Sequence, residues 1–201
     1  MKEESLMERK KGAPIPVVSI IILVACTVVG VLQLIKGDSL DYRLAMYQGA
    51  MRNGEYYRAF SCAFIHYGID HFFWNMLCAF LLGRMLEFKI GPGRYAIIYL
   101  AGIIGSSLLI EFVGGTGNMH GGASGAIWGL MGATLICALK NHEDKRGILR
   151  MILFNLIYTF VTSGISWQGH IGGLAGGTVV SLLIIPKYNQ EAAYDRYHHR
   201  L

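Results

Sequence analysis

Charged side chains are scarce in this sequence. Asp, Glu, Lys and Arg make up 15% of the 201 residues, whereas a soluble domain usually carries about 25%. Hydrophobic residues make up 53%, and the mean hydropathy is +0.42. So few charges cannot coat a soluble globule of this size, which excludes a soluble cytosolic enzyme and a disordered chain. The composition therefore predicts an all-α, polytopic membrane protein.

Cysteine is also rare and widely spaced. The four residues form no CxxC pair and lie mostly within apolar runs: Cys26, Cys62, Cys78 and Cys137. They are interpreted as small buried hydrophobic residues, which excludes a disulfide framework. The HExxH pattern of a zinc protease is absent as well. No metal and no cofactor are expected.

Glycine, by contrast, is abundant. The chain has 26 glycines, well above the usual share of about 7%, as expected for membrane helices that pack closely. The net charge is +5. In a membrane protein such an excess reflects basic cytoplasmic segments, so no nucleic-acid partner is expected.

Six apolar segments have the length of a membrane crossing, which needs about 20 residues. Residues 151–186 lack Asp, Glu, Lys and Arg altogether. This stretch is too long for one helix, and we divide it at Thr162-Ser163-Gly164. The sequence thus predicts a six-helix bundle with spans at roughly 17–35, 70–90, 94–112, 122–140, 147–162 and 168–186.

The basic residues alternate between the two sides of this arrangement. One side holds most of them, and the other holds only Lys36, Arg43, Arg52 and Arg58. The positive-inside rule then places both termini in the cytoplasm. We expect a basic N-terminal tail over 1–16, a membrane domain over 17–186 and a C-terminal tail over 187–201. Compactness and basic inner loops suggest a bacterial plasma membrane.

Polar groups inside membrane helices are costly, so each is a candidate functional group. Four stand out: His71 and Asn75 in the second span, Ser124 in the fourth and His170 in the sixth. These three spans run in the same direction, from outside to inside. Because each residue lies in the first turns of its span, all four are predicted at one depth below the outer surface.

Small residues recur every four positions near two of these groups. The fourth span has Gly125, Gly129 and Ala133, and the sixth has Gly169, Gly173 and Gly177. Such faces let two helix backbones approach closely, which would bring Ser124 and His170 within hydrogen-bonding reach.

This arrangement would permit acyl transfer. A histidine can take the proton of a serine nucleophile, and His71, Asn75 and the Ser124 backbone N–H can donate hydrogen bonds to an oxyanion. No acidic residue lies near His170 in the sequence, which favours a Ser–His dyad. Serine and histidine in membrane helices also serve packing alone, so from the residues by themselves a hydrolytic site and a structural role are both open.

The motifs resemble those of the rhomboid family of intramembrane serine proteases. The family pattern GxSG reads Gly122-Ala123-Ser124-Gly125, the GHxxG-type pattern reads Gly169-His170-Ile171-Gly172-Gly173, and HxxxN reads His71-Phe72-Phe73-Trp74-Asn75. The likeness runs from about Gly54 to Gly177 in the expected order. One such motif is weak, but the three together are highly specific.

The resemblance implies roles for these residues. Ser124 would be the nucleophile, His170 the base and acid, and His71 with Asn75 the oxyanion hole. Trp128 would lie against the His170 ring, where the family more often has Tyr or Phe. Arg58 and Glu87 would brace the outer loop and the second helix, although Tyr57 replaces the usual Trp before that arginine.

The implied activity is cleavage of transmembrane segments of other proteins near the outer face of the bilayer. Substrates would enter from the lipid, so either a helix or the loop over the site must move. The resemblance implies the minimal six-helix form with no added domain. Two rival readings are a non-proteolytic rhomboid-like protein that binds membrane clients, and a transporter. Relatives that only bind clients usually lack the Ser or the His, and this sequence has both. A transporter would be expected to have acidic groups or broken helices at the middle of the membrane, and the sequence shows neither feature.

Overall fold

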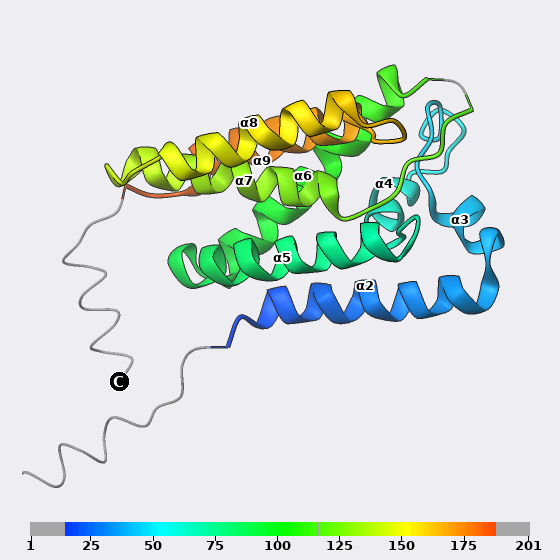
Figure 1. The fold of residues 1–201 in the computed structure, drawn as a ribbon, viewed down its shortest axis with the longest axis horizontal. Helices are drawn as coiled ribbons and strands as arrows, with labels where there is room; N and C mark the ends of the chain where they lie inside the picture. The colour runs from blue at the N-terminus through cyan, green and yellow to red at the C-terminus, as the bar shows by residue number, and fades with distance from the viewer. Residues whose placement is uncertain (1–14, 116, 188–201) are drawn as a thin grey trace, which may run out of the picture.

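The computed structural model describes residues 15–115 and 117–187, and in these ranges the regular structure is helical. Six long helices form the body of the molecule (Figure 1): α2 (Val17–Lys36), α5 (Ile69–Ile90), α6 (Pro92–Val113), α7 (Ser124–Lys140), α8 (Arg146–Val161) and α9 (Trp167–Ile184). Shorter elements lie between α2 and α5: α3 (Asp38–Leu44), α4 (Arg58–Ser61) and the 3₁₀ turn Cys62–Phe64. One isolated antiparallel bridge joins Met46 to His120.

The long helices coincide with the six apolar segments of the sequence, and their ends differ by about two residues or fewer. By length and composition, α2 and α6 are apolar enough to cross a membrane, and α7 is a shorter apolar helix. The predicted break at 162–164 separates α8 from α9. Most of the predicted tails, including His198 and His199, lie outside the described residues, so the domain limits at 17 and 186 stay a prediction.

Glycine contacts between α7 and α9 confirm the predicted packing of small residues. A Cβ atom on Gly173 would lie 2.0 Å from the carbonyl oxygen of Gly125, and one on Gly177 would lie 2.3 Å from the Cα of Gly129. Such distances leave no room for any side chain. The two backbones therefore touch, which fixes the helix that carries Ser124 against the helix of His170.

Helix α6 joins this core, which the spacing of small residues had not indicated. A Cβ on Gly105 would lie 2.4 Å from the carbonyl oxygen of Gly172, and one on Gly102 would lie 2.9 Å from the Cα of Ala126. The core is thus a three-helix unit of α6, α7 and α9, in which each helix packs closely on the other two.

Two buried side chains hold the segment between α2 and α5 in place. Arg58, which is 7% exposed, donates to the carbonyl oxygens of Tyr42 and Ala45 at 2.8 Å each and to Glu55 at 2.9 Å. Glu111 of α6 accepts hydrogen bonds from the backbone N–H groups of residues 49, 51 and 52. The loop between α2 and α5 is therefore held to α6 by buried polar contacts.

The carboxylate of Glu87 connects α5 to the start of α2. It accepts hydrogen bonds from the backbone N–H groups of Val18 and Ser19 at 2.9 and 2.8 Å, and from the Ser19 hydroxyl at 2.7 Å. A carboxylate at a helix N-terminus also interacts favourably with the helix dipole. Glu87 therefore fixes the position of α2 relative to α5.

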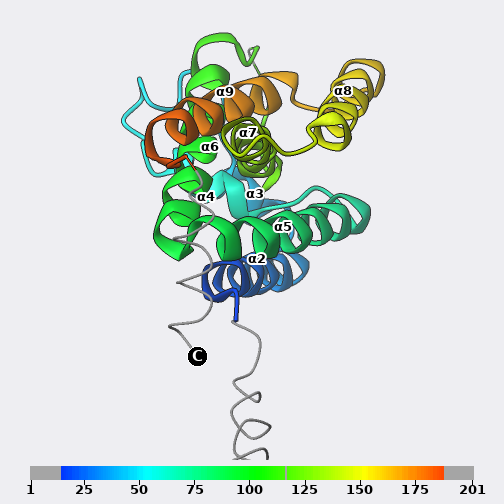
Figure 2. The same cartoon turned by 90° about the vertical axis from the view of Figure 1, so that its left-hand side faces the viewer.

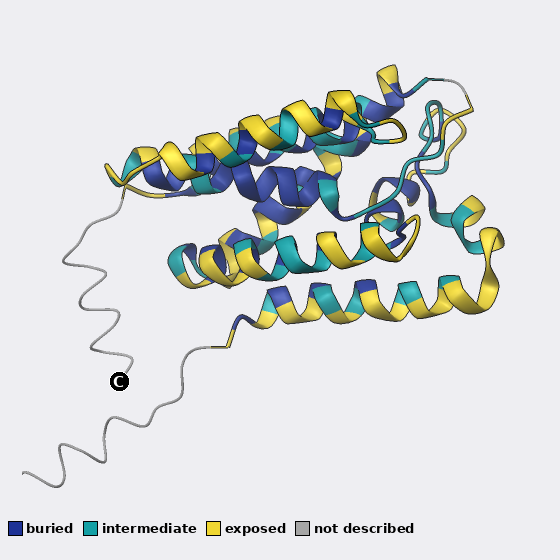
Figure 3. Cartoon of the chain, viewed as in Figure 1, coloured by how far each residue is buried: buried dark blue, intermediate teal, exposed yellow. Residues whose placement is uncertain are grey.

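Helix α8 lies at the edge of the bundle. In the view of Figure 2 it stands apart from α6 and α9, and most of its surface is exposed (Figure 3), whereas α7 is largely buried. The exposed side chains are large and apolar, including Phe154, Ile157 and Phe160. Such a helix suits a position that faces lipid.

Candidate active site

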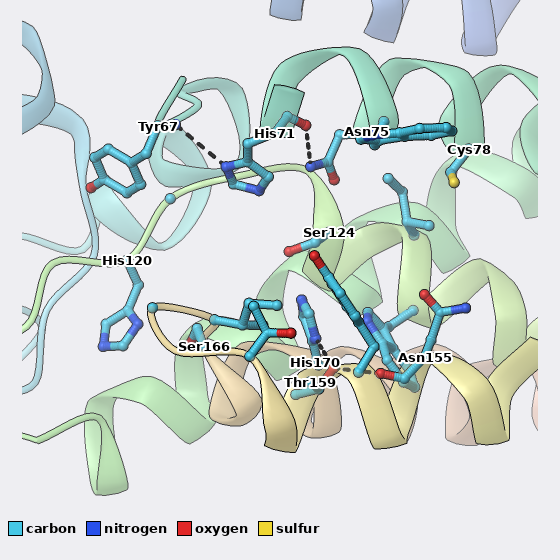
Figure 4. Close-up of a pocket in the computed structure, with 18 of the residues that line it drawn as sticks. Tyr67, His71, Asn75, Cys78, His120, Ser124, Asn155, Thr159, Ser166 and His170 are labelled. Carbon is cyan, nitrogen blue, oxygen red and sulfur yellow. Dashed lines mark hydrogen bonds between the residues drawn. The ribbon is translucent and has the colours of Figure 1, made fainter. Parts of the chain in front are cut away.

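A cavity of about 790 Å³ lies between α5, α7, α8 and α9. Ser124, His170, His71 and Asn75 all line it, so the fold brings together four residues that are far apart in the sequence. In Figure 4 Ser124 lies between His71 above and His170 below. Ser124 and His170 face the same space, but no hydrogen bond joins them in the part of the chain that the structure describes.

Ser124 is the first residue of α7. The turn before it requires glycine at Gly122, whose φ of 131° is a conformation that side-chain-bearing residues rarely adopt. A Cβ on Gly122 would lie 2.9 Å from Nε2 of His71 and 3.7 Å from the Ser124 hydroxyl oxygen. The missing side chain therefore leaves the space between His71 and Ser124 open. Gly125 is required for packing, because a Cβ there would lie 2.5 Å from the Ser106 hydroxyl.

The His170 ring is held on two sides. Trp128 of α7 stacks on it with the ring centres 5.1 Å apart and an angle of 28° between the planes, the contact that the resemblance implied. The Nδ1 atom lies 2.7 Å from the hydroxyl of Thr159 on α8. Ser166 caps the start of α9 by accepting the backbone N–H of Gly169. The orientation of the ring thus depends on three helices.

Thr159 was not among the residues expected from the sequence. Its only sequence signal is that it is a polar residue in an apolar helix, which does not show that it points toward a histidine eleven positions away. It is buried, with 3% of its surface exposed.

His71 and Asn75 lie one turn apart at the start of α5. The Asn75 side-chain amide donates to the backbone carbonyl of His71 at 2.8 Å. The backbone N–H of Tyr67 points at Nδ1 of His71 at 3.4 Å, so Nδ1 is the acceptor. This assigns the ring proton to Nε2, the atom that faces Gly122 and the cavity.

His66 holds the segment in front of Ser124. Its Nε2 accepts a hydrogen bond from the backbone N–H of Ala123 at 3.3 Å, and its own backbone N–H donates to the Gln33 side chain at 2.9 Å. Burial, and after it the neighbouring His71, lower the pKa of His66 to about 4. A neutral ring is what the acceptor role requires.

His120 also lines the cavity, on the loop before Ser124. Its backbone pairs with Met46, and its Nε2 lies 3.2 Å from the carbonyl oxygen of Gly114. Burial lowers the pKa of His120. Within the described ranges, no three His, Cys, Asp or Glu side chains are grouped so that they could hold a metal ion.

The proteins to which this chain is similar belong to one family. The chain matches the Rhomboid domain family over residues 53–187. It is 37% identical over 154 residues to the rhomboid protease GluP of Bacillus subtilis, a match that covers 71% of this chain and 30% of GluP. It is 30% identical over 172 residues to the rhomboid protease GlpG of Klebsiella pneumoniae, covering 81% of this chain and 61% of GlpG. Arabidopsis thaliana RHOMBOID-like protein 1 is 30% identical over 165 residues, with 78% and 41% covered. The chain thus spans between about a third and three fifths of these relatives.

Proposed function

The chain belongs to the rhomboid family of intramembrane serine proteases, and we propose that it cleaves transmembrane segments of other membrane proteins with Ser124 and His170. The observation that carries this proposal is the shared cavity, in which Ser124 lies at the start of α7 between His170 and His71. A serine hydroxyl needs an adjacent base to become a nucleophile, and His170 is the histidine that Trp128 and Thr159 hold at this cavity.

The proposed reaction is acyl transfer in two stages. The Ser124 hydroxyl oxygen attacks the substrate carbonyl while Nε2 of His170 takes its proton, and the same proton then passes to the leaving amine. Water next attacks the acyl-enzyme, with His170 again as the base, and releases Ser124. The intramembrane cavity must therefore admit water as well as substrate.

The oxyanion of each tetrahedral intermediate would be stabilised by three donors. His71 offers Nε2–H, because its Nδ1 accepts from Tyr67, and Asn75 has a second amide proton besides the one given to His71. Ser124 offers its own backbone N–H, since the first residue of a helix has no carbonyl partner one turn earlier. Such preorganised donors commonly supply the largest part of the rate enhancement.

We further propose that α2, α5, α6, α7, α8 and α9 all cross the bilayer, with both termini in the cytoplasm. The uneven distribution of Lys and Arg between the two sides supports this orientation. The cavity then opens toward the extracytoplasmic side, in a bacterial plasma membrane. The membrane domain extends over 17–186, between tails at 1–16 and 187–201.

The test is proteolysis in liposomes of a single-span protein with small residues at its outer end. Wild type should cleave, whereas Ser124→Ala and His170→Ala should lose activity by about 10³-fold or more. Ser39→Ala, an exposed serine on α3, is the matched control and should cleave as wild type does. Equal cleavage by all variants would reveal a contaminating protease. A folded wild type that binds such proteins and cuts none would favour the client-binding alternative.

A further inference from the structure

Thr159 links α8 to the histidine of the proposed dyad. Its hydroxyl oxygen lies 2.7 Å from Nδ1 of His170 and also 2.7 Å from the carbonyl oxygen of Asn155, one turn earlier in α8. Figure 4 shows this contact at the floor of the cavity. The three groups form a short line of hydrogen bonds from a helix backbone to the imidazole.

The proton count fixes the direction of this line. A threonine hydroxyl has a single proton, and a carbonyl oxygen can only accept. The Thr159 proton therefore goes to Asn155, which leaves lone pairs on the Thr159 oxygen for His170. Nδ1 of His170 must then carry the ring proton and donate it. In a neutral imidazole the opposite nitrogen, Nε2, is unprotonated.

The burial of Thr159 makes this arrangement persistent. The side chain is 3% exposed, so little of it is open to competing water, and an unmade hydrogen bond there is costly. Trp128 fixes the plane of the same ring by stacking. The stacking of Trp128 therefore sets the plane of the imidazole, and the hydrogen bond with Thr159 sets which nitrogen faces α8.

We propose that Thr159 is a positioning residue for His170, which holds the imidazole in the Nδ1–H tautomer with Nε2 free toward Ser124. It would do with a neutral hydroxyl what the aspartate does in a Ser-His-Asp triad. A neutral acceptor suits this depth, because a carboxylate would have to be desolvated inside the membrane. The inference rests on the proposed function, in which Nε2 of His170 is the general base.

The tautomer itself can be measured without any activity. Uniform ¹⁵N-histidine labelling of the full chain in detergent, with His170→Ala as the assignment control, reports which ring nitrogen of His170 is protonated. Wild type at neutral pH should show a protonated Nδ1 and an unprotonated Nε2. Thr159→Val, which keeps the shape but lacks the hydroxyl, should show a mixture of both tautomers. Thr159→Ser should restore the wild-type pattern.

Kinetics of the same variants separate positioning from packing. Thr159→Val should lower kcat about ten-fold or more, with KM changed less than about two-fold, and Thr159→Ser should recover most of kcat. Thr134→Val is the matched control, because Thr134 bonds a carbonyl one turn earlier in α7 in the same way, and no hydrogen bond joins it to a histidine among the described residues. It should leave kcat unchanged.

The two readouts keep the possible failures apart. A wild-type His170 protonated on Nε2, or a folded Thr159→Val with full kcat, would overturn the role of Thr159. If Thr159→Val does not fold, the wild-type spectrum and Thr159→Ser still decide the question. A wild type without proteolytic activity would contradict the proposed function instead, and the spectrum would still decide the hydrogen-bond assignment.

Discussion

Helices α7 and α8 both line the cavity, but they are held in the molecule in opposite ways. Twelve of the 17 residues of α7 are buried, compared with three of the 16 residues of α8. α7 touches its neighbours backbone to backbone through glycine, whereas α8 contacts the bundle through side chains such as Thr159. The helix of the proposed nucleophile is therefore fixed by shape, and the helix beside it depends on a few contacts.

This difference follows from the membrane as a solvent. Lipid tails are as apolar as leucine, so apolar side chains gain little by leaving lipid for the protein interior. Close backbone packing and buried hydrogen bonds decide which helices are held tightly. Glycine supplies the packing for α6, α7 and α9, and α8 lacks it. Substitutions at matched positions in the two regions test this comparison.

The largest effect is expected at Gly173. An alanine Cβ there would lie 2.0 Å from the Gly125 carbonyl oxygen, and neither backbone can move without separating α7 from α9. Gly173→Ala should lower the free energy of unfolding by about 3 kcal/mol or more and abolish cleavage. The measurement is denaturant unfolding in detergent.

Gly147→Ala on α8 is the control for this substitution. A Cβ at Gly147 meets nothing within 4 Å, and alanine favours a helix over glycine by up to about 1 kcal/mol. Its stability should stay the same or rise slightly. If both alanine variants are equally tolerated, glycine contacts do not distinguish the two regions.

The pH dependence of the free energy of unfolding tests whether His66 fixes the segment just before α7 as firmly as glycine packing fixes α7 itself. His66 holds Ala123, and its pKa is lowered from 6.5 to about 4 by burial and by His71. Above pH 6.5 the ring is neutral in both the folded and unfolded states. As the pH falls toward 4 the unfolded state takes up the proton first, so stability decreases and then levels off.

The expected loss from this one group is about 3 kcal/mol between pH 6.5 and pH 4. His66→Gln keeps an acceptor for Ala123 but does not titrate, so its unfolding free energy should depend much less on pH in this window. Unfolding at pH 7, 5.5 and 4.5 measures the difference. Parallel curves for the two proteins would show that the neutral His66 ring does not hold this segment.

The helices were predictable because apolar runs between charges are local information. The same holds for the contact of α7 with α9, since Gly125, Gly129, Gly173 and Gly177 repeat at the period that gives one helix face. The packing of α6 was not predicted. Gly102 and Gly105 are three positions apart, whereas the glycines of α7 and α9 repeat every four, and neither lies near one of the four candidate site residues. A close approach needs two partners, and only the fold identifies the second.

The candidate site was predictable to the same extent. Ser124, His170, His71 and Asn75 line one cavity, and their grouping was predicted from the direction that the charges give each span. The role of Thr159 and the path of the loop between α2 and α5 were not predictable. They depend on single hydrogen bonds between distant segments, such as that of Glu111 with residue 49, and sequence spacing does not encode these.

A smaller effect is expected where the loop between α2 and α5 meets α6. Glu111, which is 3% exposed, accepts three backbone N–H groups of the loop and also pairs with Arg52. Glu111→Gln keeps the shape but weakens these bonds, so stability should fall by about 1–2 kcal/mol.

Arg52→Gln removes the charged partner of Glu111 and is the matched control. The Arg52 side chain is 73% exposed, and an exposed ion pair contributes little. Its stability should change by less than about 0.5 kcal/mol in detergent unfolding. A larger loss from Arg52→Gln than from Glu111→Gln would mean that the ion pair, and not the backbone contacts, attaches the loop.

The smallest effect is expected at the C-terminal end of α8. Phe160 is 63% exposed and stacks on Trp167 of α9 with ring centres 6.2 Å apart. Phe160→Ala loses this stacking, worth about 0.5–1 kcal/mol, while the lost contact with lipid costs little. Phe112→Ala, which removes an exposed ring at the end of α6, gives the baseline in the same unfolding experiment. If the excess loss at Phe160 approaches that of Gly173→Ala, α8 is fixed as firmly as α7 and the contrast between the two helices does not hold.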